Sequence, residues 1–88
     1  MLSQLVDDEK KRKIVKFILD KNPKGRYHNE ICEYIGGSKT SVHEALVELE
    51  QSGLVKSKPG LSNGRPVRLY NIDENDRNLI RAFPEILQ

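Results

Sequence analysis

The sequence contains one cysteine, Cys32, and no tryptophan. A single cysteine excludes an internal disulfide framework and a zinc site built from several cysteines. Long hydrophobic runs are absent as well, since no stretch approaches the roughly 20 apolar residues that a membrane-spanning helix needs. The apolar part of residues 1–13 is too short for a secretory signal and precedes the charged residues instead of following them. We therefore expect a cytoplasmic protein with no membrane contact.

Signals of catalysis and of a bound cofactor are also missing from the sequence. No spacing pairs a nucleophile with a base and an orienting acid. The glycines occur singly or as the pair Gly36-Gly37, without a phosphate-binding loop. We expect no enzyme, no cofactor and no small-molecule ligand.

One pattern favours a metal site. His28 and Cys32 are four residues apart, a spacing that places two ligands on one face of a helix, and Glu30 and His43 are candidates for further ligands. Two side chains are too few for a site, however, and a lone cysteine on a helix is more often a small core residue. We therefore predict no metal site. If Cys32 is exposed, it could instead join two subunits.

Length and composition fit one small domain spanning residues 1–88. A chain of 88 residues forms one modest core, and 36% hydrophobic with 32% charged residues is ordinary for a folded domain. The net charge of +2 decides little, but the bases are grouped. Five lie in Lys10–Lys16 and four in Leu54–Tyr70, with no acid in either range. Such grouping gives basic surfaces to a nearly neutral protein.

Apolar spacing predicts three helices in the first part of the chain. The first covers about residues 7–21 and ends before Pro23, with its lysines on the wet side. The second covers residues 28–35 and ends at Gly36-Gly37. The third covers residues 38–53, with Ser38 as its N-cap. Its predicted buried stripe consists of Val42, Ala45, Leu46 and Leu49.

After Gly53 the pattern changes from helical to alternating. Residues 54–58 and 67–72 are predicted strands, and the segment between them holds the turn-forming residues Pro59, Gly60, Asn63 and Gly64. The last segment predicts a helix that begins at Asp73 or Asp76 and ends or kinks at Pro84. The predicted fold class is mainly α with a small β-hairpin.

The stretch "SVHEALVELEQSGLVKSK" followed by "GRPVRLYNI" resembles the winged helix-turn-helix transcription regulators of bacteria and archaea. The resemblance covers about residues 8–73 and leaves extra helical segments at both termini. It implies a sequence-specific regulator that binds double-stranded DNA. The recognition helix, residues 38–52, would enter the major groove, and the wing, residues 54–72, would contact the adjacent backbone or minor groove.

The resemblance also implies which side chains meet DNA. In the recognition helix these are Ser38, Lys39, Thr40, Ser41 and His43. On the wing, Arg65 would follow or enter the minor groove, and Lys56, Lys58 and Arg68 would neutralise phosphates.

Two charged features outside this set allow more than one interpretation. Glu44 would either accept a hydrogen bond from a cytosine amino group or remain solvated. The basic run "KKRKIVK" at residues 10–16 would either contact phosphates or form the wet face of the first helix.

The alternative function is that of a winged-helix protein-protein interaction module within a larger complex, because fold alone does not separate the two. The basic wing favours DNA, whereas an exposed Val47 would favour a protein partner. Apolar residues at the two termini either close the same core or build a homodimer, which we favour. These residues are Leu2, Leu5, Val6, Leu79, Ile80, Phe83, Ile86 and Leu87.

Overall fold

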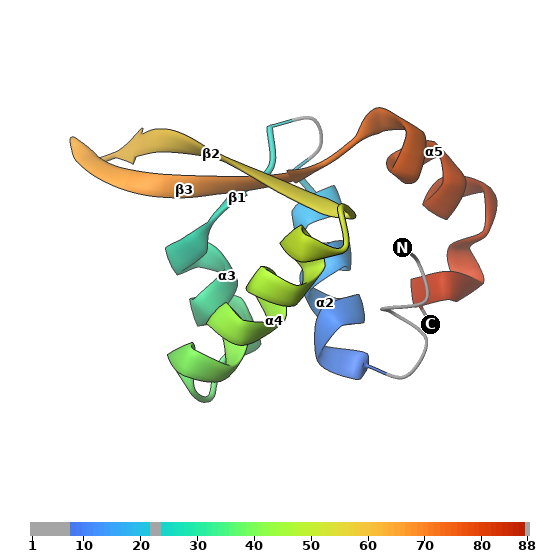
Figure 1. The fold of residues 1–88 in the computed structure, drawn as a ribbon, viewed down its shortest axis with the longest axis horizontal. Coiled ribbons are helices and arrows are strands. Elements are labelled where there is room, and N and C mark those ends of the chain that lie inside the picture. Colours follow the sequence, from blue (N-terminus) through green and yellow to red (C-terminus); the bar gives the residue numbers. More distant parts are fainter. Residues whose placement is uncertain (1–7, 22–23, 88) are drawn as a thin grey trace.

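The computed structural model describes residues 8–21 and 24–87. Three helices are followed by a hairpin and a C-terminal helical segment (Figure 1). The elements, in chain order, are α2 (Glu9–Leu19), β1 (Arg26–Tyr27), α3 (His28–Ile35), α4 (Lys39–Gln51), β2 (Val55–Ser62), β3 (Arg65–Ile72), α5 (Glu74–Ala82) and the 3-10 helix η1 (Pro84–Leu87). The strands form one antiparallel sheet in the order β1-β3-β2. The fold is a winged helix, which confirms the predicted class.

The core lies where the three helices meet the inner face of the sheet. Helices α2 and α4 bury residues spaced three and four apart, as the apolar periodicity predicts, whereas α3 buries the adjacent Ile31 and Cys32. The buried apolar residues are Ile14, Val15, Ile18, Ile31, Cys32, Val42, Ala45, Leu46, Leu49, Leu54, Val55, Tyr70, Ile72 and Ile80. Ile35 of α3 is only partly buried.

Helices α3 and α4 begin and end close to their predicted bounds. Gly36 and Gly37 both have positive φ, 75° and 70°, which ends α3 at a conformation that glycine adopts without strain. The hydroxyl of Ser38 accepts a hydrogen bond from the amide of Ser41 at 3.4 Å and caps α4. These local signals fix the turn between the two helices.

Helix α2 is shorter than predicted, and one of its lysines is not on the wet side. Asp8 caps the helix by accepting from the Lys11 amide at 3.0 Å, while Asp7 lies outside the described residues. The Lys11 side chain is 8% exposed, and its ammonium lies 2.7 Å from a carboxylate oxygen of Glu48. The prediction was wrong here because this ion pair lets a lysine lie between α2 and α4.

Strand β1 was not predicted. Gly25 precedes it with φ of +86°, and Arg26 and Tyr27 then pair with Tyr70 and Leu69 of β3. A Cβ atom at Gly25 would lie 2.3 Å from the carbonyl oxygen of Tyr70. Only glycine therefore allows the chain to approach β3 this closely.

The wing is a longer and tighter hairpin than predicted. Its turn consists of Asn63 and Gly64 alone, with φ of 54° and 78°, as a two-residue type I′ turn requires. The predicted loop from 59 to 66 was wrong because Pro59 and Gly60 belong to β2, and an edge strand tolerates proline. Arg65 is the first residue of β3 and does not sit on a flexible loop.

Tyr27 connects three parts of the fold. Its backbone N–H donates to Glu30 of α3 at 3.0 Å, and its hydroxyl donates to the carbonyl of Leu61 in the wing at 3.2 Å. Gly60 leaves space for the ring, since a Cβ atom there would already lie 3.4 Å from it. The wing is thus fastened to the start of α3.

The C-terminal segment lies on the side of the molecule opposite the wing tip (Figure 1). Ile80 of α5 is buried, whereas Leu79 and Phe83 are 41% and 49% exposed. Ile86 and Leu87 pack partly buried against the core. Pro84 begins η1 and so ends the preceding helix, as predicted. Leu2, Leu5 and Val6 lie outside the described residues.

No helix within residues 8–21 and 24–87 is long and apolar enough to cross a bilayer.

Candidate nucleic-acid interface

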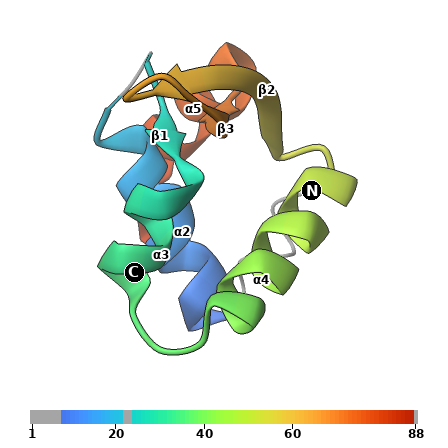
Figure 2. The same ribbon diagram turned by 90° about the vertical axis from the view of Figure 1, so that its left-hand side faces the viewer.

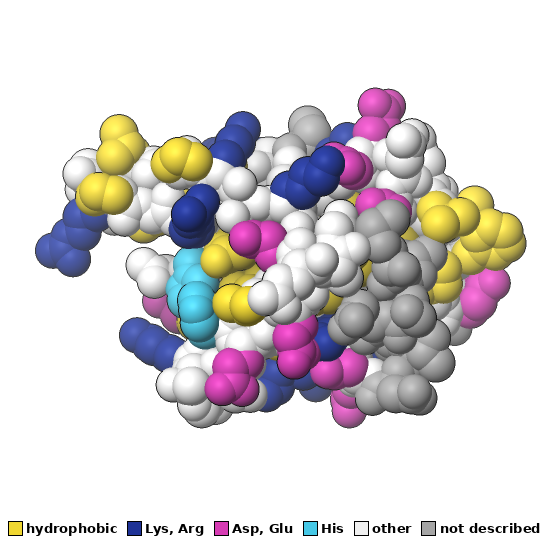
Figure 3. Space-filling model, viewed as in Figure 1, with side chains coloured by type: hydrophobic (Ala, Val, Ile, Leu, Met, Phe, Trp, Pro, Cys, Tyr) yellow, Lys and Arg dark blue, Asp and Glu magenta, His cyan; other side chains and the backbone are white. Residues whose placement is uncertain are grey.

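A groove of about 800 Å³ lies between the wing and helices α3 and α4. Figure 2 faces this side of the molecule and shows the hairpin above, with α3 and α4 on either side below it. The charged and polar residues of its lining include His28, Asn29, His43, Glu50, Arg65 and Arg68. In Figure 3 the two histidines lie in this hollow, and lysine and arginine side chains lie above and below them. The groove therefore combines two arginines and two imidazoles with an apolar part that consists of Val47, Pro59, Pro66, Val67 and Tyr70.

The N-terminal part of α4 presents most of its predicted contacts to solvent. Lys39, Thr40 and His43 are exposed, while Val42 between them is buried. Ser38 is exposed but uses its hydroxyl as the helix cap. A helix whose first turn is exposed in this way can approach a duplex closely.

Ser41 is placed differently from its neighbours. It is half-buried, and its hydroxyl accepts a hydrogen bond from the ammonium of Lys10. One lysine of the basic run at residues 10–16 thus fixes α4 against α2. Glu44, by contrast, is exposed.

The four bases of the wing divide between its two faces. Side chains alternate along paired strands, so Arg68, opposite Pro59, belongs to the inner face, and Lys56 and Lys58 belong to the outer face. Lys56 lies 2.6 Å from the carboxylate of Asp73, at the base of the wing. Lys56 thus differs from the other three bases of the wing, because it forms an ion pair within the protein and lies far from the hairpin tip.

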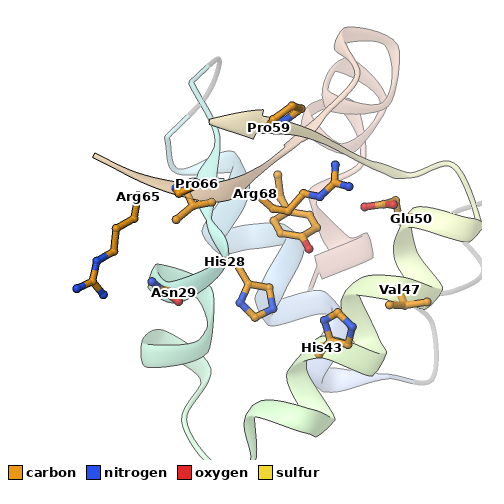
Figure 4. Close-up of a pocket in the computed structure, with 11 residues that line it drawn as sticks. His28, Asn29, His43, Val47, Glu50, Pro59, Arg65, Pro66 and Arg68 are labelled. Atoms are coloured by element: carbon orange, nitrogen blue, oxygen red, sulfur yellow. The ribbon is translucent and has the colours of Figure 1, made fainter. Parts of the chain in front are cut away.

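The two arginines of the wing both line the groove. Arg65 projects from the end of the hairpin, and Arg68 is directed along the groove toward Glu50 (Figure 4). One guanidinium nitrogen of Arg68 also donates to Ser57 at 3.4 Å. The predicted pairing of α4 with an arginine-bearing wing on one side of the molecule is therefore present in the geometry.

The groove also shifts the pKa values of two groups. Burial lowers the pKa of His28, and the nearby His43 and Lys39 lower it further. Burial raises the pKa of the Tyr70 hydroxyl, with Glu50 adding to the effect. At neutral pH the His28 imidazole and the Tyr70 phenol are both uncharged.

Cys32 lies behind the groove. Its Sγ atom is 3.6 Å from Nδ1 of His28, and the residue is 7% exposed. Burial raises the pKa of the thiol, so it stays protonated at neutral pH. A buried thiol is not accessible for joining two subunits in this conformation.

The four residues considered as metal ligands do not form a ligand set. Across the described ranges, no group of three or more His, Cys, Asp or Glu side chains is positioned to hold a metal ion. The Glu30 carboxylate instead accepts from the Tyr27 amide and lies 3.4 Å from the guanidinium of Arg26.

Sequence reasoning missed the part of the groove contributed by α3 and by the inner face of the sheet. Asn29 and Tyr70 line it, and His28 was considered only as a metal ligand. These residues are far apart in sequence, so no local pattern joins them. A signal did exist in α4, where His43, Val47 and Glu50 recur on the unburied face at helical spacing.

Comparison with known proteins gives a likeness in fold. No family model matches the sequence, and the search of curated proteins found no relative. Among solved structures, Staphylococcus aureus MepR in complex with DNA matches with a TM-score of 0.77 at 18% identity, covering 97% of this chain and 68% of that chain. MepR bound to ethidium bromide matches with a TM-score of 0.68 at 16% identity, covering 97% and 66%.

Lactococcus lactis ZitR, a zinc-responsive MarR family member, matches with a TM-score of 0.62 at 20% identity, covering 86% of this chain and 52% of that chain. At these identities the likeness shows the winged-helix fold that this chain shares with transcription regulators. The chain spans between 52% and 68% of the length of these three structures.

Proposed function

We propose that this protein is a transcriptional regulator that binds double-stranded DNA in a sequence-specific manner. The observation that supports this most directly is the common groove: the exposed first turns of α4 and the two arginines of the wing face the same side. A helix and a basic hairpin arranged in this way can contact adjacent grooves of one duplex. The likeness of the fold to MepR, which has been solved in complex with DNA, adds support.

In the proposed mode the N-terminal half of α4 enters the major groove. Lys39 contacts a phosphate, Thr40 faces base edges, and His43 faces the sugar-phosphate backbone. Arg65 lies along the adjacent backbone or minor groove, and Arg68 neutralises a phosphate beside it. Ser38 and Ser41 act mainly by holding α4 in place, since their hydroxyls bond within the protein.

The test is a binding assay that starts from random duplexes. Fluorescence anisotropy at two salt concentrations, with selection and sequencing of the bound duplexes, measures affinity, salt dependence and preference together. We expect affinity to fall as salt rises and a defined sequence to be enriched. Affinity that does not change with salt, or the absence of an enriched sequence, would contradict the proposal.

Thr40 is predicted to determine part of the sequence preference. Replacing Thr40 with valine keeps the shape of the side chain and removes the hydroxyl, so we expect a loss of about 1–3 kcal/mol on the selected duplex and little change on random duplexes. Thr40→Ser, which keeps the hydroxyl, is the matched control. Equal losses on selected and random duplexes would show that Thr40 does not contribute to preference.

The proposed regulator acts as a homodimer through its terminal segments. Leu79 and Phe83 lie exposed on the side away from the wing tip, where a second copy would leave both α4 helices accessible. Two copies would then contact half-sites about one turn of DNA, ~10 bp, apart. A cytoplasmic location remains a prediction.

The dimer is tested by sedimentation. At tens of micromolar we expect a dimer for the wild type and a shift toward monomer for Phe83→Ala, because the substitution removes the apolar surface that would be buried. Leu61→Ala serves as control, since Leu61 is 67% exposed on the wing, on the side opposite the C-terminal segment. A wild-type chain that sediments as a monomer would contradict the assignment.

A second candidate function has one observation in its favour. Val47 of α4 is 39% exposed and lines the groove, as an interaction module that binds a protein partner would require. Pro59, Pro66, Val67 and Tyr70 of the sheet also line the groove. Arg65 and Arg68 lie among them, however, and charged residues are depleted at the core of protein-protein interfaces. We therefore rank a protein partner below DNA.

A further inference from the structure

The two histidines of this protein face each other across the floor of the groove. His28 comes from α3 and His43 from α4, and their ring centroids are 5.7 Å apart with the rings tilted by 60°. Figure 4 shows both rings between the wing and α4. The sequence contains no other histidine. Any imidazole titration of this protein therefore comes from this pair.

The charged groups around the pair are mostly cations. Lys39 on α4 is close enough to disfavour protonation of His28, and Arg65 and Arg68 line the same groove from the wing. Glu50 is the acid among the residues that line this groove, and Figure 4 shows it at the far side of Arg68. The pair thus lies where an anion, and not a further cation, would be favoured.

On the basis of the proposed DNA-binding function, we propose that His28 and His43 form a proton-linked site for one backbone phosphate of the duplex. Nδ1 of His28 lies 3.6 Å from the Cys32 thiol, so Nε2 is the His28 atom that would donate to the phosphate. At this ring separation a hydrogen bond of about 2.8 Å from His43 can end on another oxygen of the same phosphate. The phosphodiester carries one negative charge, which favours the protonated form of His28, so the His28 imidazole takes up a proton from solvent. No covalent bond changes in this step.

The direction of the pH dependence follows from the state of the free protein. Burial, His43 and Lys39 hold the pKa of His28 below its ordinary value, so the ring is neutral near pH 7 before DNA binds. A bound phosphate favours the charged ring and raises that pKa, so binding takes up protons. By linkage, affinity rises as pH falls, by at most about tenfold per pH unit for each proton. The rise in affinity ends once the pH falls below the pKa of His28 in the free protein.

The experiment measures affinity for the selected duplex between pH 8.0 and 5.5 at constant ionic strength, for the wild type, His28→Gln and His43→Gln. We expect the wild type to gain about tenfold between pH 7.5 and 6.0, as one linked proton allows. Each variant is expected to lose most of this gain while still binding at pH 8.0. Histidine resonances of the wild type, followed by NMR with and without duplex, report the same proton uptake without any substitution.

The outcomes separate this inference from the function on which it is based. Wild-type binding that does not change with pH, or variants that keep the full gain, would overturn the histidine site and leave DNA binding intact. Failure to bind any duplex would overturn both. Inorganic phosphate is a further arm of the NMR titration, and histidine shifts as large as those with duplex would indicate a site for free anions instead of DNA.

Discussion

Affinity for duplex DNA is expected to fall about 100-fold at ~0.1 M salt when Arg65 and Arg68 are both replaced with alanine. Both guanidinium groups line the groove beside α4, and each is proposed to replace one condensed counterion on the duplex. Removing one arginine–phosphate pair lowers the slope of log affinity against log salt by about 0.9, so the slope should become shallower by about two for the double variant. Anisotropy titrations at four salt concentrations measure both quantities.

The control for this double variant removes two positive charges elsewhere. Lys16 on α2 and Arg81 on α5 are exposed and do not line the groove. Replacing both with alanine should change affinity less than about threefold, since distant exposed charges are screened. If the two double variants lost affinity equally, only net charge would matter and the groove would not be the contact surface.

Gly25→Ala is expected to be the most destabilising single substitution considered for this fold, by more than about 3 kcal/mol. The left-handed conformation at φ of +86° costs a residue with a Cβ about 1–2 kcal/mol. The new Cβ would also lie 2.3 Å from the Tyr70 carbonyl oxygen, so β1 would have to move away from β3. Urea unfolding followed by circular dichroism gives the change in the free energy of unfolding.

Gly37→Ala separates the cost of the left-handed backbone conformation from the cost of the contact with the Tyr70 carbonyl. Gly37 also has positive φ, +70°, but a Cβ there would meet nothing within 4 Å. It should therefore cost only about 1–2 kcal/mol, the backbone part alone. Equal losses for the two variants would contradict the close approach of Gly25 to β3.

The parts of the fold that the sequence predicted well depend on neighbouring residues. The turn between α3 and α4 follows from Gly36-Gly37 and the Ser38 cap, which act within a few residues and favour one local conformation. The buried stripe of α4 follows from helical spacing in the same way.

The parts that were missed depend on residues far apart. Strand β1 has only two residues, and what makes it a strand is pairing with Leu69 and Tyr70, more than forty positions later. The length of the wing was misjudged because Pro59 and Gly60 are typical turn residues. In this fold Pro59 lies on the edge strand β2, where a proline is tolerated, and Gly60 leaves space for the Tyr27 ring.

In the candidate site, too, the features set by neighbouring residues were predicted and those set by distant residues were not. The resemblance predicts DNA contacts for Lys39, Thr40, His43, Arg65 and Arg68, and this stays a prediction. In the structure His43 and both arginines line the groove, and Lys39 and Thr40 are exposed on the first turn of α4. The sequence did not predict which charged and polar side chains would pair with one another within the protein. Tertiary contacts alone determine those pairings.

The pairings in question are Lys10 with Ser41, Lys11 with Glu48, and Lys56 with Asp73.

Tyr27 couples the position of the wing to that of α3. One side chain starts from the strand that precedes α3 and ends on the carbonyl of Leu61 near the hairpin tip. A tilt of the hairpin would therefore pull on the helix-turn-helix, and a displaced α3 would pull on the hairpin. In the proposed DNA complex, this hydrogen bond would favour one spacing between the wing and the helices over other spacings.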